Sequence, residues 1–331
     1  MNILTNQKLK IIFWGTPEFA LPSLEALINP ALFKKGGVKN GYEISAVITN
    51  PDEPVGRKQI LTPPPVKIFA QKHKIPVFQP SKLEIGNWKL EIPRADLYVV
   101  AAYGKIIPKA IIELPRFGSL NIHPSLLPRW RGASPIQYTI LNGDAETGVT
   151  IIEMDELMDH GPIVAVSEII KLEPKITYQK LHDKLAELGA DLLVKTLPKW
   201  VKGEITPQPQ NDSEATFSKI LKKEDGQINW SRPAEEIEQM VRAFNPWPGS
   251  WTTWPTQRQA YRIKIEETGG VSDDMPDKPN GYVWQNDSFP VAVKTGRKSL
   301  IIQKLTLEGK KTQNADSFVQ GYPQIINSLL V

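Results

Sequence analysis

The chain has 331 residues, which is typical of two domains at about 150 residues each. Hydrophobic residues make up 40% of it and charged residues 23%, so collagen-like and intrinsically disordered classes are excluded. No apolar run reaches the roughly 20 residues that a membrane-spanning helix needs, so no contact with a membrane is expected. The chain has no cysteine and its four histidines show no ligand spacing, so neither disulfides nor a metal site are expected.

The net charge of +4 is unevenly distributed along the chain. Residues 57–109 contain ten Lys and Arg against three Asp and Glu, whereas residues 144–191 contain four against eleven. One basic face would attract a polyanion, but two ordinary solvated surfaces explain the same counts equally well. Residues 1–10 have no apolar h-region and no arginine-rich amphipathic stretch, so a cytoplasmic protein is expected.

The first two hundred residues alternate between apolar strands and amphipathic helices. Strands are predicted at Lys10–Trp14, Ile44–Thr49, Leu97–Ala102 and Ser119–Ile122. Helices are predicted at Phe19–Ile28, from Val66 onward and within Ile176–Val201. Strands with nearly continuous apolar runs belong to parallel sheets that are covered on both faces, so we expect an α/β, Rossmann-like domain with a mostly parallel sheet.

The pattern changes after the polar, proline-containing segment Gly203–Asn211. A helix is predicted at Ala234–Phe244, and short alternating runs separated by turn residues follow it. These runs are Tyr261–Ile265, Tyr282–Trp284, Val291–Val293 and Leu300–Leu305. They predict a small, OB-like β-barrel, so we expect a first domain at residues 1–203, a linker at 204–211 and the barrel domain at 212–331.

The most informative polar residues lie in SLNIHPSLLPRWRG, residues 119–132. Asn121 and His123 are two positions apart, so on a strand both side chains lie on one face, at the carboxyl end where open α/β sheets bind ligands. An amide and an imidazole placed together can donate hydrogen bonds to a developing oxyanion. On these residues alone, an Asn that caps a turn and a His packed in the core are the favoured explanation.

A second candidate segment is MDELMDHGP, residues 154–162. It places three carboxylates within seven residues and ends on Gly and Pro, which predicts a loop. A carboxylate held on such a loop can take part in acid–base chemistry at a reaction centre. A solvated acidic turn is the alternative interpretation.

Several segments together resemble the methionyl-tRNA formyltransferase family. In the first half they are FWGTPEFALPSLEAL (13–27), TNPDEPVGRKQILTPPPVK (49–67), SLNIHPSLLPRWRGASP (119–135) and MDELMDHGPI (154–163). INWSRPAEEIEQMVRAFNPWPGSW (228–251) extends the resemblance into the second half, to about three quarters of the chain. The Asn-x-His-Pro-Ser-Leu-Leu-Pro run is shared by the wider family of 10-formyltetrahydrofolate-dependent formyltransferases.

The resemblance implies that residues 1–203 transfer a formyl group from 10-formyltetrahydrofolate to the α-amino group of methionyl-initiator-tRNA. Asn121, His123 and Asp159 match the family's catalytic residues, which would stabilise a tetrahedral oxyanion and move a proton without a metal or a covalent enzyme intermediate. The matches to folate-binding residues are Ser125, Leu126, Leu127, Pro128, Ile106 and Ile107. Ordinary core packing is the alternative for the two isoleucines.

Basic residues in two places are candidates for contacts with the tRNA. Arg57 and Lys58 lie on a connection that is much longer than the ~2–6 residues usual in α/β units and that enters the acceptor stem in the family. Lys294, Arg297 and Lys298 belong to a basic cluster of the second domain that suits contacts with an RNA backbone. Besides the tRNA, no obligate protein partner is implied, and a monomer is expected.

Two other functions fit part of this pattern. A sugar-nucleotide N-formyltransferase would share the catalytic residues and the folate site, but it should lack the loop at residues 49–67 and the NPWPGSW segment, which are both present. A catalytically silent RNA-binding homologue would not need Asn121, His123 and Asp159 intact. The single glycine of GTPEF and the lack of a Walker motif leave nicotinamide and ATP chemistry poorly supported.

Overall fold

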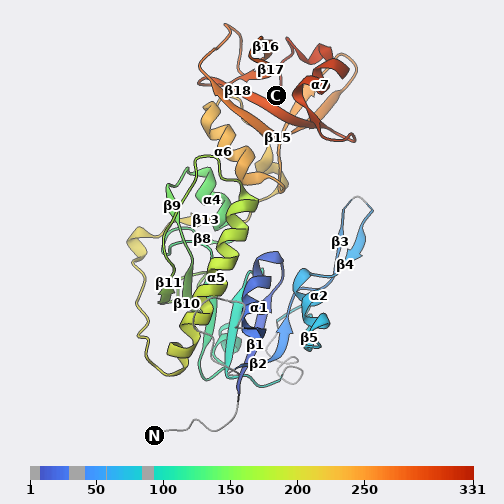
Figure 1. Cartoon of the computed structure of the whole chain (residues 1–331). Coiled ribbons are helices and arrows are strands. Elements are labelled where there is room, and N and C mark those ends of the chain that lie inside the picture. The colour runs from blue at the N-terminus through green and yellow to red at the C-terminus, as the bar shows by residue number, and fades with distance from the viewer. Residues whose placement is uncertain (1–7, 30–41, 57, 84–92) are drawn as a thin grey trace. The chain divides into compact units, whose positions relative to one another are not determined.

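The computed structural model describes residues 8–29, 42–56, 58–83 and 93–331, which form two compact units (Figure 1). Unit 1 comprises residues 1–135, 146–171 and 182–218, and unit 2 comprises residues 136–145, 172–181 and 219–331. Two short segments of the expected first domain, residues 136–145 and 172–181, therefore fold with residues 219–331. One reason is a hydrogen bond of 2.8 Å from Arg242 Nη1 to the carbonyl oxygen of Ile176. The predicted division at residues 204–211 would have placed both segments in the first domain.

Unit 1 is built on a seven-stranded sheet with the order β11-β10-β7-β6-β1-β2-β5. Its strands are β1 (Leu9–Gly15), β2 (Tyr42–Ile48), β5 (Val77–Phe78), β6 (Leu97–Ala101), β7 (Ser119–His123), β10 (Thr150–Glu153) and β11 (Ile163–Val166). The strands from β7 to β5 pair in parallel, whereas β10 and β11 pair antiparallel at one edge. The predicted mostly parallel sheet is therefore confirmed.

Helices and three small strand pairs surround this sheet. The helices are α1 (Leu21–Ile28), α2 (Pro65–Lys72), α3 (Lys109–Ile112) and α5 (Tyr178–Val201), with short 3-10 turns η1 (Glu18–Ala20) and η3 (Asp212–Glu214). The small pairs are β3 (Glu53–Val55) with β4 (Ile60–Thr62), β8 (Arg131–Gly132) with β13 (Phe217–Ser218), and β9 (Glu146–Thr147) with β12 (Ile170–Lys171). Within the described ranges, no helix combines the length and the apolarity needed to cross a bilayer.

Hydrophobic packing covers both faces of the sheet, as its apolar strands require. On one face, a buried cluster joins Trp14 of β1 and Ile48 of β2 to Ile111 of α3. α1 and α5 pack against each other through Ala26 and Ala190. This arrangement leaves the carboxyl ends of the parallel strands as the edge at which a ligand site can form.

The long connection at residues 50–65, which was expected to be a loop, contains a β-hairpin. Strands β3 and β4 pair antiparallel from Glu53 opposite Thr62 to Val55 opposite Ile60. Gly56 adopts a φ of +73° at the turn, a conformation that glycine accommodates without strain. A strand of three residues is too short to show a recognisable alternation of apolar and polar residues, which explains why the hairpin was not predicted.

Unit 2 is an antiparallel β unit with helices packed on it. Its sheet has the order β14-β15-β18-β17-β16, with β19 beside β18. The strands are β14 (Ser250–Pro255), β15 (Ala260–Ser272), β16 (Val283–Asn286), β17 (Phe289–Lys294), β18 (Ser299–Leu307) and β19 (Gln313–Asn314). The helices are α4 (Pro135–Leu141), α6 (Ala234–Phe244) and α7 (Ala315–Gly321), with 3-10 turns η4 (Lys223–Gly226) and η5 (Pro323–Ile325). The predicted C-terminal β domain is confirmed, and α6 has the predicted bounds.

The core of unit 2 forms between α6, α7 and the sheet. α6 buries Ile237, Val241 and Phe244, which are spaced at i, i+4 and i+7 and so lie on one helix face. Two of these contact a buried cluster that includes Trp254 of β14 and Phe318 of α7. The amphipathic pattern of α6 is thus the sequence feature that docks the helix on the sheet.

Candidate active site

The candidate catalytic residues converge at the carboxyl end of β7. Asn121 and His123 occupy alternate positions of this strand, beside Ile152 and Thr150 of the antiparallel neighbour β10. Asp159 lies on the loop that connects β10 to β11. β10 ends beside Leu120, so the loop runs back along β7 before Asp159 contacts the amide and the imidazole, which the strand alternation has placed on one face.

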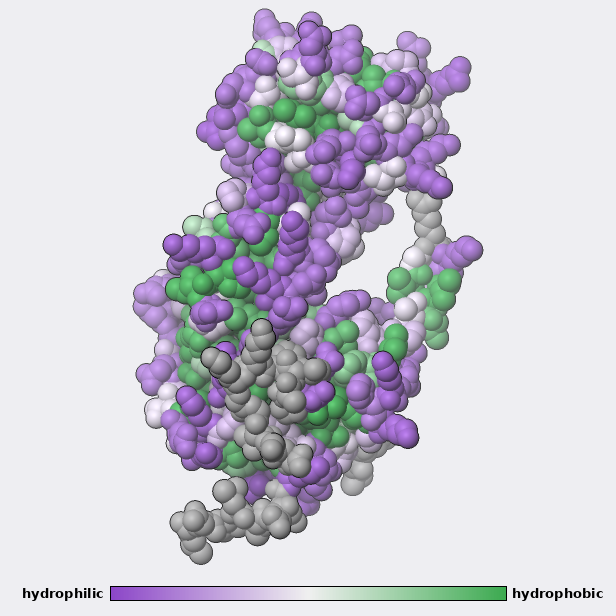
Figure 2. Space-filling model, viewed as in Figure 1, coloured by the Kyte–Doolittle hydropathy of each residue, from purple (hydrophilic) through white to green (hydrophobic). Residues whose placement is uncertain are grey.

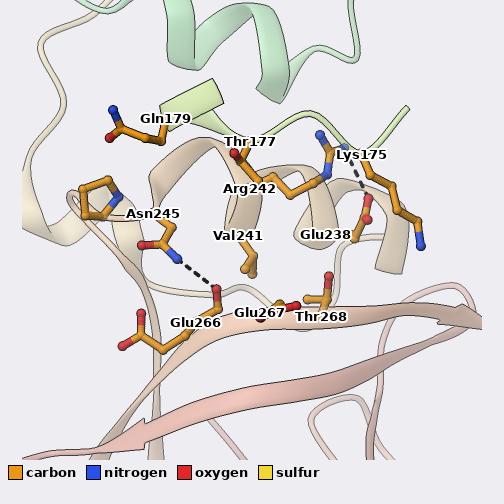
Figure 3. Close-up of a pocket in the computed structure, with 11 residues that line it drawn as sticks. Lys175, Thr177, Gln179, Glu238, Val241, Arg242, Asn245, Glu266, Glu267 and Thr268 are labelled. Carbon is orange, nitrogen blue, oxygen red and sulfur yellow. Dashed lines mark hydrogen bonds and ion pairs between the residues drawn. The ribbon is translucent and has the colours of Figure 1, made fainter. Parts of the chain in front are cut away.

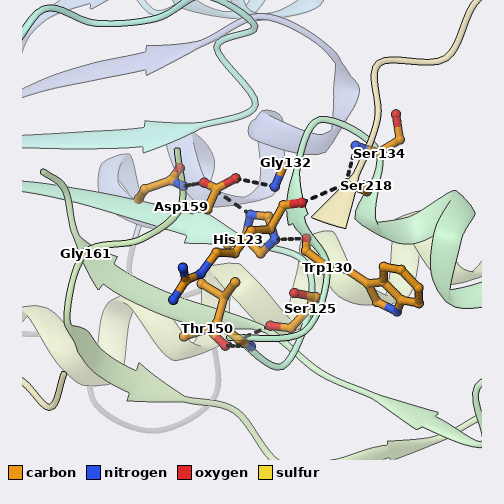
Figure 4. A network of polar contacts seen from close by, with 12 residues as sticks. His123, Ser125, Trp130, Gly132, Ser134, Thr150, Asp159, Gly161 and Ser218 are labelled. Carbon is orange, nitrogen blue, oxygen red and sulfur yellow. Dashed lines mark hydrogen bonds and ion pairs between the residues drawn. The ribbon is translucent and has the colours of Figure 1, made fainter. Parts of the chain in front are cut away.

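Asp159 is the centre of the polar network (Figure 4). Its Oδ1 accepts a hydrogen bond of 3.1 Å from Asn121 Nδ2 and lies 3.5 Å from His123 Nδ1. Its Oδ2 accepts a hydrogen bond of 2.8 Å from the backbone nitrogen of Gly132. The structure thus brings together Asn121, His123 and Asp159, which are up to 38 residues apart in the sequence.

The orientation of His123 follows from its second nitrogen. His123 Nε2 lies 2.9 Å from the carbonyl oxygen of Trp130. A carbonyl oxygen can only accept a hydrogen bond, so Nε2 carries a hydrogen whether the ring is neutral or charged. The nitrogen that gains or loses a proton is therefore Nδ1, which faces Asp159.

Burial and charge act in opposite directions on this pair. Burial would lower the pKa of His123, but the negative charge and hydrogen bond of Asp159, together with the Trp130 carbonyl, raise it above its usual value. Burial would likewise raise the pKa of Asp159, but His123, the Gly132 N–H group and the charge of Arg131 lower it. Both directions favour an imidazolium opposite a carboxylate.

A tight backbone segment supports the donor to Asp159. Gly132 has a φ of +110°, and a Cβ at this position would lie 2.3 Å from the carbonyl oxygen of Ser218 in β13. Ser218 Oγ in turn donates to the carbonyl oxygen of Arg131 and accepts from the backbone nitrogen of Ser134. Only glycine fits at residue 132 without moving β13, so the glycine keeps its N–H group directed at Asp159.

Two polar residues of this network were not predicted. Arg131, whose side chain is only 5% exposed, donates from Nε to Gln210 Oε1 at 3.0 Å and from Nη2 to Asp212 Oδ1 at 2.7 Å. Gln210 Nε2 donates to the carbonyl oxygens of Asp159 and Gly161, at 2.9 and 2.8 Å. Arg131 lies in the SLLPRWRG segment, where a charged residue among apolar ones could have marked it as a candidate for the site. No sequence pattern distinguishes Gln210 from its polar neighbours.

The residues matched to folate binding differ in exposure. Ile106 is 78% exposed and Leu126 is partly exposed, whereas Ile107 packs in the core cluster beside α3. Ser125 is buried and donates to the carbonyl oxygen of Arg129 at 2.6 Å, which closes the turn that carries Leu126 and Leu127. Thr150 fixes the same turn, because its Oγ1 accepts from Leu127 N and donates to the Ser125 carbonyl.

The candidate tRNA-binding residues have unequal surroundings. Arg57 lies outside the described residues, and Lys58 is exposed beside the turn of the β3–β4 hairpin. Apolar side chains cover much of this hairpin (Figure 2), and the exposed ones are Val55, Ile60 and Leu61. In unit 2, Lys298 pairs with Glu235 and Asp273, Arg297 pairs with Glu235, and Lys294 donates to the carbonyl oxygen of Lys278.

A pocket of about 450 Å³ lies within unit 2, between α6 and β15 (Figure 3). Its lining contains none of the candidate catalytic residues. The carboxylates of the lining are paired: Glu238 with Arg242 at 3.2 Å, Glu266 with Lys264 at 2.9 Å and Glu267 with Lys304 at 2.6 Å. Each of these three carboxylates is thus held by a cation.

Comparison with known proteins assigns the chain to a family. Residues 9–197 match the formyl transferase family, and residues 220–323 match the formyl transferase C-terminal domain. A methionyl-tRNA formyltransferase of Synechococcus sp. (strain JA-3-3Ab) is 42% identical over 322 residues, which cover 95% of each chain. The chain belongs to the methionyl-tRNA formyltransferase family. A second member, from Marinobacter nauticus, is 42% identical over 324 residues, which cover 96% of this chain and 98% of its own.

Two solved structures share the fold at low identity. The N-formyltransferase of Helicobacter canadensis, in complex with folinic acid and dTDP-3-aminofucose, has a TM-score of 0.61 at 19% identity and covers 89% of this chain and 99% of its own. HypX of Aquifex aeolicus in complex with tetrahydrofolic acid has a TM-score of 0.62 at 15% identity over 97% of this chain. This chain spans 48% of the length of HypX. At these identities the likeness shows the fold alone.

Proposed function

We propose that this chain transfers the formyl group of 10-formyltetrahydrofolate to the α-amino group of methionyl-initiator-tRNA, which yields formylmethionyl-tRNA for translation initiation. The convergence of Asn121, His123 and Asp159 at the end of β7 carries the proposal. It occurs in a chain that is 42% identical to methionyl-tRNA formyltransferases over nearly its whole length. The acceptor is therefore proposed to be a charged tRNA, not an amino sugar.

In this reaction the amine nitrogen attacks the formyl carbon, and collapse of the tetrahedral intermediate releases N10 of tetrahydrofolate. Asn121 Nδ2 has two hydrogens, of which one bonds to Asp159, so the other can donate to the oxyanion. His123 Nδ1, held opposite Asp159, supplies or takes the proton as the amine loses one and N10 gains one. The bond from Nε2 to the Trp130 carbonyl keeps the ring from turning during these steps.

The turn after β7 has the chemistry that a folate needs. A pterin ring is flat and apolar on its faces and carries amide-like groups at its edge, so it suits apolar walls with backbone hydrogen bonds. Ile106 and Leu126 offer exposed or partly exposed apolar surface, and Pro128 is also partly exposed. We assign Ser125 and Leu127 to support of this turn, because both are buried and hydrogen-bonded within it.

Contacts with the tRNA are proposed for Arg57 and Lys58 in the connection at residues 50–65, and for Lys294, Arg297 and Lys298 in unit 2. Lysines and arginines of this kind bind phosphates and fix register without reading sequence. Lys58 is exposed next to the hairpin turn, so it can reach a phosphate without breaking a described ion pair. Lys298 can bind a phosphate only by giving up part of its contact with Glu235 and Asp273.

The test is transfer of labelled formyl from 10-formyltetrahydrofolate to three acceptors: methionyl-tRNA, free methionine and a dTDP-amino sugar. The expected result is label in the charged tRNA alone. Label in the amino sugar would assign the chain to sugar formylation, and binding of tRNA without any transfer would identify a silent RNA-binding homologue. The variant His123→Gln, assayed in parallel, shows whether the label depends on the site at the end of β7.

A further inference from the structure

We propose that Gln210, together with Arg131, is a positioning residue that holds the Asp159 loop in its reactive conformation. This inference rests on the proposed function, because it concerns the carboxylate that faces His123. Gln210 lies in the segment that the sequence analysis took for a linker. Its side chain contacts the backbone of the loop and not the carboxylate itself, so it acts on the reaction through Asp159.

The loop needs such support because its backbone is strained. Asp159 has a φ of +50°, a left-handed conformation that non-glycine residues adopt only in a few per cent of cases. Gly161 packs so closely that a Cβ there would lie 1.8 Å from the carbonyl oxygen of Glu153. The loop backbone is therefore restricted to a narrow range of conformations. The direction of the Asp159 carboxylate depends on how firmly that conformation is held.

Gln210 holds this path with both hydrogens of its amide. Its Nε2 donates to the carbonyl oxygen of Asp159, the strained residue, and to that of Gly161, two residues later. The amide oxygen accepts from Arg131 Nε, which fixes the amide so that the NH₂ group, and not the oxygen, faces the loop. Arg131 cannot lose its charge at physiological pH, so this orientation is permanent.

Arg131 is itself held by a carboxylate on the same segment. Its Nη2 donates to Asp212 Oδ1, and Asp212 Oδ2 lies 3.6 Å from His160 Nε2. The charged groups that face Asp159 are thus His123 on one side and Arg131 on the other, with Asp212 and His160 beyond. The segment at residues 210–212 therefore supplies the backbone clamp and holds Arg131, the cation that favours the ionised form of Asp159.

The test compares Gln210→Met with Gln208→Met in the full-length protein. Methionine matches glutamine in length but cannot donate, so Gln210→Met removes the clamp and leaves the space filled. Gln208 is the matched control, because it lies two residues away and its side chain donates only to the carbonyl oxygen of Thr206 among the described contacts. Gln210→Glu is a second variant, since it keeps an acceptor for Arg131 but sets an oxygen against the two loop carbonyls.

Two measurements are made on each variant: the kinetics of formylation, and the pKa of His123 by NMR titration, with its signal assigned from His123→Gln. Asp159 raises the pKa of His123, so a loosened loop must lower it. We expect Gln210→Met to show a lower His123 pKa, and both Gln210 variants to show a kcat reduced roughly 10- to 100-fold, with KM values within about twofold. Gln208→Met should match the wild type in all of these.

An unchanged His123 pKa in Gln210→Met overturns the proposal, whether kcat is retained or falls together with the melting temperature. In the second case Gln210 contributes only to packing. The titration needs no substrate, so it decides on the clamp even if the wild-type protein transferred no formyl to methionyl-tRNA. A failure of the proposed function and a failure of the clamp are therefore seen in different experiments.

Discussion

Asn121 illustrates how much of the site depends on single hydrogen-bond donors. Its Nδ2 donates to Asp159 Oδ1 at 3.1 Å and has a second hydrogen for the oxyanion. The variant Asn121→Ala is expected to reduce the single-turnover rate of formylation by about 10²–10³, which is the usual effect of losing one oxyanion donor. Because the lost donor acts in the transition state, KM for methionyl-tRNA should change little. A variant with full activity would remove Asn121 from the mechanism.

The pair of His123 and Asp159 makes the stability of unit 1 depend on pH. The raised pKa of His123 gives stability that is present below about pH 6.5 and is lost as the pH rises through the folded-state value. The lowered pKa of Asp159 gives stability that is present above about pH 4 and is lost as the pH falls through its folded-state value. Both contributions are therefore present together between these limits.

Asp159→Asn is expected to lower the free energy of unfolding most at pH 5.5 and less at pH 9. At pH 5.5 the wild type holds an ion pair, whereas the variant must bury His123 either neutral or unpaired. Once the pH exceeds the raised pKa of His123, the imidazole is neutral in both proteins, so the difference becomes smaller as the pH rises. Urea unfolding at the two pH values measures this change, and an equal loss at both would mean that the two residues are not coupled.

At the scale of elements, the short parallel pair β8–β13 carries Gly132 and thus the donor to Asp159. Gly132→Ala combines a φ of +110° with a Cβ placed 2.3 Å from Ser218 O, so a loss of about 2–4 kcal/mol in the free energy of unfolding is expected. Gly203→Ala is the control, because Gly203 also has a positive φ, +70°, but open space around it. Equal losses in urea unfolding would show that the approach of β13 does not restrict residue 132.

The same elements show what a sequence can and cannot reveal. β7 was predictable because its apolar run is long enough to read, and the period of two then places Asn121 and His123 together. The hydrogen bonds of Gln210 and the pairing of β13 with β8 were not predictable. A strand of two residues has no period, and its partner lies 86 residues away, so only the folded chain brings them together.

At the scale of the whole molecule, a net charge of +4 and a sequence pI near 8.9 favour a polyanionic substrate only weakly. The basic cluster of unit 2 is partly neutralised by its own ion pairs, with Glu235 serving both Arg297 and Lys298. Lys310 and Lys311 are exposed, and the described contacts give their side chains no acidic partner. A phosphate can therefore bind these two lysines without displacing a carboxylate.

This difference predicts how binding of methionyl-tRNA depends on salt. Each lysine that neutralises a phosphate contributes about 1 to the slope of log K against log salt concentration. If the tRNA contacts Lys310 and Lys311, the double substitution Lys310→Ala with Lys311→Ala should reduce the slope by about 2, because neither lysine has an acidic partner among the described contacts. Lys298→Ala should reduce it by clearly less than 1, because Glu235 and Asp273 already neutralise Lys298.

Fluorescence anisotropy of labelled tRNA from 50 to 200 mM KCl, roughly the range in which such contacts are released, measures these slopes on the full chain. A slope that none of the three substitutions changes would mean that the RNA contacts lie elsewhere, with Lys58 on the hairpin as the next residue to replace.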